Sequence, residues 1–287
     1  MDHSSTQVNM LKDVQDMQKV KEMLDKSINI LGWDVLELCL NGPEDKLAET
    51  KHCQPAMFIG GLAGLEKLKA DQPEKVNRAA IMAGLSLGEY TALCAAGVME
   101  FEDALKLVKL RGEAMQEAAT IGKQAMLSVA GLEKSVLEPL CKQAVAKEGA
   151  GAVCAIANSL FPKGFSVGGT EDAIKALQAL AEHHGALQAK ILKTGGAFHT
   201  SLMKPAQDKL VEALEEVAPK MKSPLHTVWM NASAKPVRPG CDPRKDILPL
   251  MKKQLTSVVL EIRRRRVTPR TGHRAVAKHK DCVLRFS

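Results

Sequence analysis

Aromatic side chains are scarce in this chain, at 3% of its 287 residues, with a single tyrosine. The core must therefore be aliphatic, and the 45% hydrophobic content suffices for one large domain or for a large and a small one. No uninterrupted apolar run approaches the roughly 20 residues that cross a bilayer. The first residues have neither the basic nor the apolar region of a signal peptide. These absences predict a soluble protein without a membrane anchor.

Paired cysteine motifs are also absent. The seven cysteines are an odd number, widely scattered, and no two form a Cys-x-x-Cys pair. This distribution favours reduced thiols and argues against a structural zinc site. We therefore expect no bound metal.

The net charge of +7 is concentrated at one end of the chain. Residues 261–287 contain nine basic and two acidic side chains, so the rest of the chain sums to zero. Because this segment also lacks apolar periodicity, we expect a solvated, disordered tail, with binding to nucleic acid or another acidic surface as the weaker interpretation.

Apolar spacing predicts most helices and strands. Helices are expected at residues 14–31, 55–68, 88–96, 101–119, 205–217 and 247–255, with strands at 78–83 and 227–231. Between them, residues 124–192 follow the order strand, helix, strand, strand, helix, strand, which is typical of a ferredoxin-like unit. We predict an α/β fold: a large α/β domain with a parallel sheet (8–123 and 193–260), interrupted by a small ferredoxin-like α+β subdomain (124–192).

The stretch Ala79–Tyr90 is an apolar run that ends in Gly-x-Ser-x-Gly and then becomes helix-forming. A strand that turns at once into a helix is typical of a nucleophile elbow, and glycines at both flanking positions remove the Cβ atoms that would clash there. Ser86 would stand exposed at the helix N-terminus, which favours negative charge on a reacting oxygen. An ordinary turn is the alternative, but the strand-turn-helix context favours the elbow.

A serine nucleophile needs a base, and His199 is the best placed of the eight histidines. It follows a glycine pair, Gly195 and Gly196, and precedes a helix start, from which an imidazole can reach a cleft. Taken alone, the position also suits an ordinary loop histidine. Likewise, Arg111 taken alone suits a solvated arginine on the helix 101–119.

Three segments, Gly84–Leu93, Val108–Gln116 and Ala197–Pro205, resemble the core motifs of the malonyl-CoA:acyl carrier protein transacylases. Weaker matches occur at Leu31–Asp34, Asn41–Glu44, Gln54–Ala56, Ala157–Ser159, Asn231–Val237 and Gln254–Leu255. Order and spacing agree from about Val8 to Leu260. Leu85 replaces the histidine of the commoner bacterial version and is similar to the plant and algal plastid form.

The resemblance implies a hydrolase-like large domain and assigns roles to matched residues. Ser86 would accept the malonyl group as an ester, and His199 would activate it and later protonate the departing thiol. Arg111 would bind the free carboxylate of malonate through two parallel hydrogen bonds. The implied reaction transfers malonyl from malonyl-CoA to the phosphopantetheine thiol of acyl carrier protein, in fatty acid biosynthesis, without a cofactor.

Other roles are implied for neighbouring groups. The backbone N–H of Leu87 would form part of the oxyanion hole, and the main chain of Gln254 would orient His199. Asn158 would line the pocket, although a turn residue that caps a strand is an equal alternative. Phe198 resembles the malonyl-selective pattern.

Both ends of the chain depart from the family. The first strand and its Pro-Gly-Gln-Gly-Ser-Gln segment are absent, and Gln7 is at best the last residue of that motif. We therefore expect an unpaired edge beside the elbow strand and a missing second oxyanion donor, which typically costs about 100- to 1,000-fold in turnover. The family's C-terminal segments do not follow Leu260.

Two alternative functions follow from these departures and from the elbow. One is a catalytically impaired homologue that only binds CoA or acyl carrier protein, and the other is a serine esterase. The resemblance implies a monomer in a plastid or mitochondrion, although no targeting peptide is visible, and otherwise in the cytoplasm.

Overall fold

In the computed structural model, which describes residues 8–260 and 282–286, the strands form two separate sheets. The four-stranded sheet, which belongs to the large α/β domain, has the order β7 (Lys235–Val237), β6 (Thr227–Met230), β1 (Ala79–Gly84), β9 (Cys282–Phe286). Strand β1 is parallel to β6 and β9, whereas β7 is antiparallel to β6. The sheet is therefore mixed rather than wholly parallel, because the chain reverses directly between β6 and β7.

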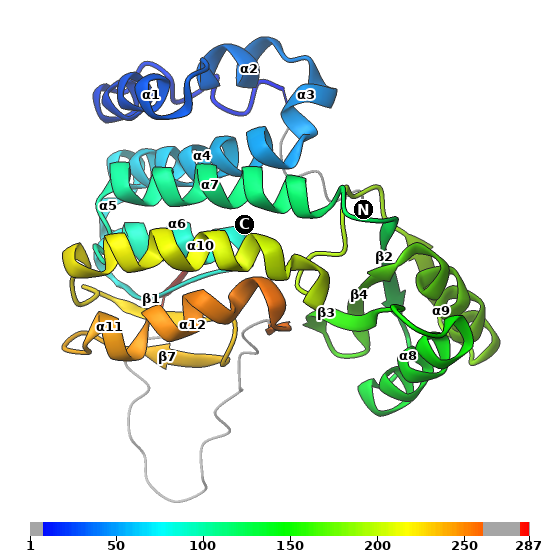
Figure 1. Cartoon of the computed structure of the whole chain (residues 1–287). Coiled ribbons are helices and arrows are strands. Elements are labelled where there is room, and N and C mark those ends of the chain that lie inside the picture. The colour runs from blue at the N-terminus through cyan, green and yellow to red at the C-terminus, as the bar shows by residue number, and fades with distance from the viewer. Residues whose placement is uncertain (1–7, 261–281, 287) are drawn as a thin grey trace, which may run out of the picture.

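Helices pack in layers over this sheet (Figure 1). The outermost are α1 (Gln18–Leu31), α2 (Val35–Asn41) and α3 (Glu44–Ala48), followed by α4 (Thr50–Asp71) and α7 (Phe101–Ala118). The others are α5 (Pro73–Asn77), α6 (Leu87–Ala95), α10 (Lys204–Val217), α11 (Pro243–Asp246) and α12 (Leu248–Lys253). Leucine, valine, alanine and methionine side chains dominate the core between them, as the low aromatic content predicts. No helix among residues 8–260 and 282–286 combines the length and apolarity needed to cross a bilayer.

The second sheet forms the smaller lobe on the right of Figure 1. Its chain order is β2 (Gln124–Ala130), α8 (Lys134–Glu148), β3 (Cys154–Phe161), β4 (Gly164–Thr170), α9 (Glu171–His183) and β5 (Gln188–Ile191). The spatial order β5-β2-β4-β3-β8 and the separate apolar core confirm the predicted ferredoxin-like arrangement. Strand β8 (Val259–Leu260) joins its edge by pairing with β3. We propose the boundaries 8–123 with 193–260 and 124–192, although β8 extends the small sheet.

Two predicted helices differ from the structure in detail. Helix α4 begins at Thr50, so Pro55 lies in its second turn, and burial of Ala56 and Phe58 beyond it offsets the loss of one backbone hydrogen bond. The helix expected at 247–255 is instead the short helix α12 followed by a 3₁₀ turn at Gln254–Thr256, and α11 precedes it. This turn carries Gln254 towards the elbow.

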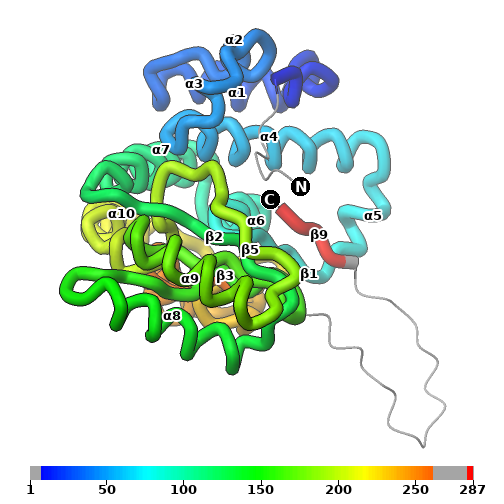
Figure 2. Tube along the Cα trace, turned by 90° about the vertical axis from the view of Figure 1, so that its right-hand side faces the viewer, coloured from blue at the N-terminus to red at the C-terminus, as the bar shows by residue number. Residues whose placement is uncertain are grey.

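Strand β9 corrects two expectations about the end of the chain. Its residues lie in the segment 261–287 that we expect to be disordered, and they fill the edge beside β1 that we expect to be unpaired (Figure 2). The pairing continues past β1, where the N–H of Leu85 donates to the carbonyl oxygen of Phe286 at 3.3 Å. The free edge of a buried strand can pair with any extended apolar segment. Residues 261–281, with the arginine cluster on which the nucleic-acid interpretation depends, lie outside the described residues.

Leu284→Asp is expected to destabilise the large domain. Leu284 lies opposite Met82 in the register and packs against the large core, so an aspartate there would place a charge against apolar side chains. We expect a loss of about 2–3 kcal/mol in the free energy of unfolding, measured by denaturant titration. Leu187→Asp is the control, because that leucine is 88% exposed. Equal stability of the two variants would contradict the packing of β9.

Candidate active site

Ser86 lies at the junction of β1 and α6, in a strained backbone conformation. Its φ is 53° and its ψ is −102°, a combination that non-glycine residues rarely adopt. The N–H of Ser86 donates to the side-chain oxygen Oδ1 of Asn231 at 2.6 Å. The strand before Ser86 and the helix after it agree with the predicted elbow.

Gly84 allows the end of β1 to approach the first turn of α6. A Cβ atom at position 84 would lie 2.0 Å from the carbonyl carbon and oxygen of Gly88. Because both atoms belong to the backbone, the helix start could not move without displacing Ser86. The first glycine of the motif is therefore required by close packing.

Gly84→Ala is accordingly expected to cost at least about 2 kcal/mol of stability and to abolish acylation of Ser86, since overpacking forces the backbone to shift. Thermal unfolding and acyl-enzyme formation would measure the two effects. Gly64→Ala is the matched control: a Cβ there meets nothing within 4 Å, and alanine is the better helix former. Wild-type stability in Gly84→Ala would contradict this geometry.

His199 lies within hydrogen-bond distance of Ser86, with 2.7 Å between Nε2 and Oγ. Its other ring nitrogen, Nδ1, is 2.9 Å from the backbone carbonyl oxygen of Gln254. Since a carbonyl only accepts, Nδ1 carries the proton and the Nε2 lone pair faces the serine hydroxyl. The hydroxyl of Thr200 donates to the carbonyl oxygen of Ala197, and this hydrogen bond closes the turn that contains His199.

Burial lowers the pKa of His199 to about 4, and the positive charge of Arg111 acts in the same direction. The imidazole is therefore neutral at pH 7 and able to accept a proton.

This shift predicts a pH dependence of stability. Between pH 6.5 and 4 the unfolded chain binds a proton at this position and the folded chain does not, so stability falls as the pH falls. We expect wild type to lose up to about 1.4 kcal/mol per pH unit relative to His199→Asn. Denaturant unfolding across this range measures the difference. Thr91→Val, which changes no titratable group, should follow wild type, and parallel curves for His199→Asn and wild type would contradict the shift.

Arg111 reaches the same hydroxyl from α7. Its Nη2 donates to Ser86 Oγ at 2.9 Å and to Gln254 Oε1 at 3.1 Å, while Nη1 donates to Gln54 Oε1. Arg111 is 1% exposed, and its guanidinium carbon lies 5.4 Å from the centre of the Tyr90 ring. It forms no ion pair with Asp or Glu in the part of the chain that the structure describes. Its hydrogen bonds go to neutral acceptors, and Glu89 acts on it electrostatically without direct contact, so the guanidinium still favours an incoming anion.

Gln254 and Leu87 complete the surroundings of the serine. The side-chain Nε2 of Gln254 donates to the backbone oxygen of Ser86 at 2.9 Å. Leu87 is the first residue of α6, so its N–H has no acceptor within the helix. Such an N–H is available to a developing negative charge on a bound carbonyl oxygen.

Asn158 has no hydrogen bond to these groups among the described residues. It is within β3, opposite Ser166, and its amide donates to the Ser166 hydroxyl at 2.5 Å. None of its recorded contacts reaches Ser86, His199 or Arg111. Its position inside β3 excludes the alternative role of capping a strand end, whereas the lining of the pocket by Asn158 stays a prediction.

Three residues that contact the site have no role assigned by sequence reasoning. Asn231 binds the backbone on both sides of Leu85, Gln54 binds Arg111, and Glu89 binds Gln254. Each lies within a segment that resembles the family. Their contacts span long sequence separations, which residue patterns do not reveal.

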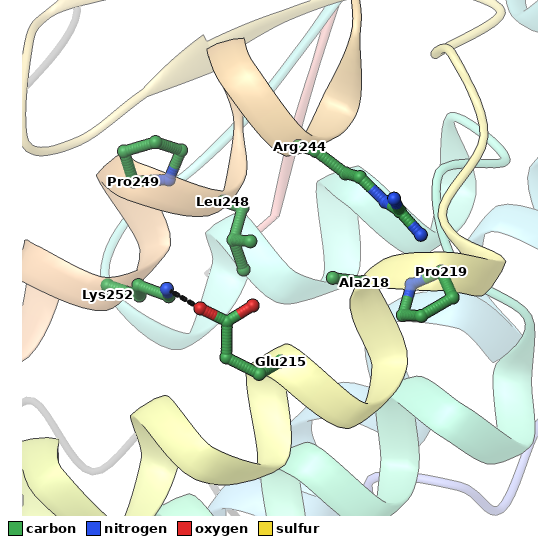
Figure 3. Close-up of a pocket in the computed structure, with 7 residues that line it drawn as sticks. All are labelled: Glu215, Ala218, Pro219, Arg244, Leu248, Pro249 and Lys252. Carbon is green, nitrogen blue, oxygen red and sulfur yellow. Dashed lines mark hydrogen bonds and ion pairs between the residues drawn. The ribbon is translucent and has the colours of Figure 1, made fainter.

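Two cavities differ in their relation to the site. One of about 90 Å³ is lined by Gly84, Leu85, Asn231, Phe286 and neighbouring residues. A larger one, of about 530 Å³, lies between α10 and the α11–α12 segment, where Lys252 pairs with Glu215 (Figure 3). None of the site residues lines it. The described residues include no cluster of three His, Cys, Asp or Glu side chains suited to a metal ion.

The sequence profile of the acyl transferase domain matches residues 8–242. The chain belongs to the acyl transferase family. One relative is the mitochondrial malonyl-CoA-acyl carrier protein transacylase of Homo sapiens, which is 38% identical over 259 residues. The alignment covers 88% of this chain and 64% of the human protein. The malonyl CoA-acyl carrier protein transacylase of Haemophilus influenzae is 34% identical and is covered to 75%.

Solved acyl transferases have the same fold. The crystal structure of the acyl-carrier-protein S-malonyltransferase from Burkholderia pseudomallei superposes with a TM-score of 0.81 at 34% identity, covering 90% of this chain and 80% of that one. This chain spans less than two thirds of the human and mouse relatives, at 64% and 60% of their lengths.

Proposed function

We propose that this chain transfers the malonyl group of malonyl-CoA to the phosphopantetheine thiol of acyl carrier protein, in fatty acid biosynthesis. The observation that carries the proposal is the buried guanidinium of Arg111, which has no directly bonded carboxylate in the described chain and donates to the oxygen of Ser86. An acyl group that carries its own carboxylate would supply a directly bonded anion next to the nucleophile. The names of the human and bacterial relatives agree with this substrate.

In the first half-reaction, Ser86 Oγ attacks the thioester carbonyl carbon of malonyl-CoA while His199 Nε2 takes its proton. The Nδ1–H bond to the Gln254 carbonyl stabilises the imidazolium that forms. The N–H of Leu87 faces the oxyanion. The C–S bond then breaks, the CoA sulfur takes the proton from His199, and malonyl remains as an ester on Ser86.

In the second half-reaction, the carrier protein thiol repeats these steps in reverse. His199 takes the thiol proton, the sulfur attacks the ester carbonyl, and Ser86 leaves with the proton. Arg111 holds the malonate carboxylate throughout, so the acyl group keeps its orientation. Each step exchanges one acyl bond for another, and we therefore propose that no cofactor takes part.

The proposal is tested by incubating the chain with radiolabelled malonyl-CoA and then adding holo acyl carrier protein. We expect label on Ser86 that moves to the carrier protein and is unchanged by prior dialysis against EDTA. Carrier protein binding without labelling would indicate a binding module, and rapid release of free malonate would indicate an esterase.

We also propose that the protein acts in an organelle, as a monomer. The human relative is named mitochondrial, and the Gly-Leu-Ser form of the elbow is similar to plastid enzymes. Subcellular fractionation and analytical ultracentrifugation test the two parts separately.

A further inference from the structure

The carboxylate of Glu89 is buried beneath the elbow and takes no part in the transfer described above. Glu89 lies on α6, three residues after Ser86, and is fully buried. It forms no ion pair within the described chain, and burial raises its pKa to about 7. Burying a carboxylate costs free energy unless hydrogen bonds replace its lost hydration.

Both oxygens of Glu89 accept hydrogen bonds from residues that touch Ser86. Oε2 accepts the backbone N–H of Asn231, and Oε1 accepts from Nε2 of Gln254 at 3.0 Å. The carboxylate therefore connects two segments more than 140 residues away in the sequence to the helix that follows the nucleophile.

Through Asn231, Glu89 reaches the strained backbone of the elbow. The Asn231 amide accepts the N–H of Ser86 at 2.6 Å and donates to the carbonyl oxygen of Gly84 at 2.7 Å. These two bonds span Leu85 and hold the turn at positive φ. The backbone N–H of Asn231 donates to Glu89, and this hydrogen bond fixes the position of Asn231 relative to the elbow.

Through Gln254, Glu89 sets the orientation of an amide that acts on both catalytic side chains. A carboxylate only accepts and a guanidinium only donates, so Gln254 must direct Nε2 to Glu89 and Oε1 to Arg111. In this orientation Nε2 also donates to the backbone oxygen of Ser86, while the backbone oxygen of Gln254 accepts from His199.

We propose that Glu89 is a positioning residue of the acyl-transfer site, which holds Ser86 through Asn231 and holds His199 in register with it through Gln254. This inference rests on the proposed transfer function. Misplacement of reacting groups by about 1 Å can cost about 100-fold in rate, which sets the scale of the expected effect.

The test is Glu89→Gln, compared with Thr91→Val. Glutamine keeps the shape but offers one acceptor oxygen to two donors, so one of them loses its partner. We expect the single-turnover acylation rate to fall about 10- to 100-fold, while the half-saturating malonyl-CoA concentration stays within about threefold. Thr91 is buried on the same helix, and its hydroxyl has no hydrogen-bond partner among the described residues, so Thr91→Val should retain the wild-type rate.

Asn231→Ala keeps the test decisive if Glu89→Gln does not fold. It removes the two side-chain bonds to the elbow and leaves the carboxylate in place, and we expect the same fall in rate at similar half-saturation. Wild-type rates in the folded variants, or an equal fall in Thr91→Val, would overturn the positioning role. A wild-type chain that never acylates Ser86 would instead overturn the proposed function. The positioning role can then still be tested by hydrogen exchange of the backbone amides of Ser86 and Asn231. We expect this exchange to be faster in Glu89→Gln than in Thr91→Val.

Discussion

Ser86→Ala should form no acyl-enzyme with malonyl-CoA and should lose at least about 10,000-fold in transfer rate, because in the proposed reaction this hydroxyl is the one group of the protein that bonds to the acyl carbon. The side chains that hydrogen-bond to Ser86, those of His199, Arg111, Asn231 and Gln254, would remain in place. The chain should therefore fold and still bind malonyl-CoA.

Intact-protein mass spectrometry after incubation with malonyl-CoA measures this effect directly. Ser135→Ala, an exposed serine on α8, is the control and should acylate like wild type. Persistent malonylation of Ser86→Ala at wild-type rate would place the nucleophile elsewhere. A burst of hydrolysis without any stable adduct in wild type would favour the esterase.

Arg111→Ala should change the choice of acyl group more than the chemistry itself. Without the buried guanidinium the carboxylate of bound malonate is left unpaired, which costs about 2–5 kcal/mol of binding free energy. We therefore expect kcat/KM for malonyl-CoA to fall about 100- to 1,000-fold. Acetyl-CoA carries no carboxylate and should lose far less. Arg111→Lys should not restore malonyl transfer, because an ammonium group cannot make two parallel hydrogen bonds.

The measurement is the ratio of malonyl to acetyl transfer in each variant, with folding checked by circular dichroism. Arg78→Ala is the control: that arginine is exposed, and its side chain donates to a backbone oxygen on its own helix. An equal loss with both acyl groups would show that Arg111 supports the structure and does not select the substrate.

The elbow could be predicted from sequence because its requirements are local. Gly84, Ser86 and Gly88 are close in the chain, and the clash that explains the glycine, 2.0 Å between a Cβ at position 84 and the Gly88 backbone, arises within five residues. The ferredoxin-like order was equally accessible, since each of its elements has its own apolar spacing and the strands follow one another. Here local preference and tertiary packing favour the same structure.

The remaining features depend on contacts between distant segments. Strand β9 pairs with β1 across about 200 residues, and its neighbours in the chain are strongly basic, so composition alone predicts disorder. Glu89 and Asn231 meet only after β6 pairs with β1. In the sequence, such a contact is indicated only by a Glu or Asn within an otherwise apolar motif, and this pattern does not show which residue it contacts.

The position of a trapped malonyl group tests the central claim most directly. We expect a crystal structure of the protein incubated with malonyl-CoA to contain an ester on Ser86 Oγ, with the free carboxylate against both terminal nitrogens of Arg111 and Nε2 of His199 facing the ester oxygen. A malonyl group attached to another residue, or a carboxylate directed to solvent with Arg111 still bound to Gln54 and Gln254, would contradict the account.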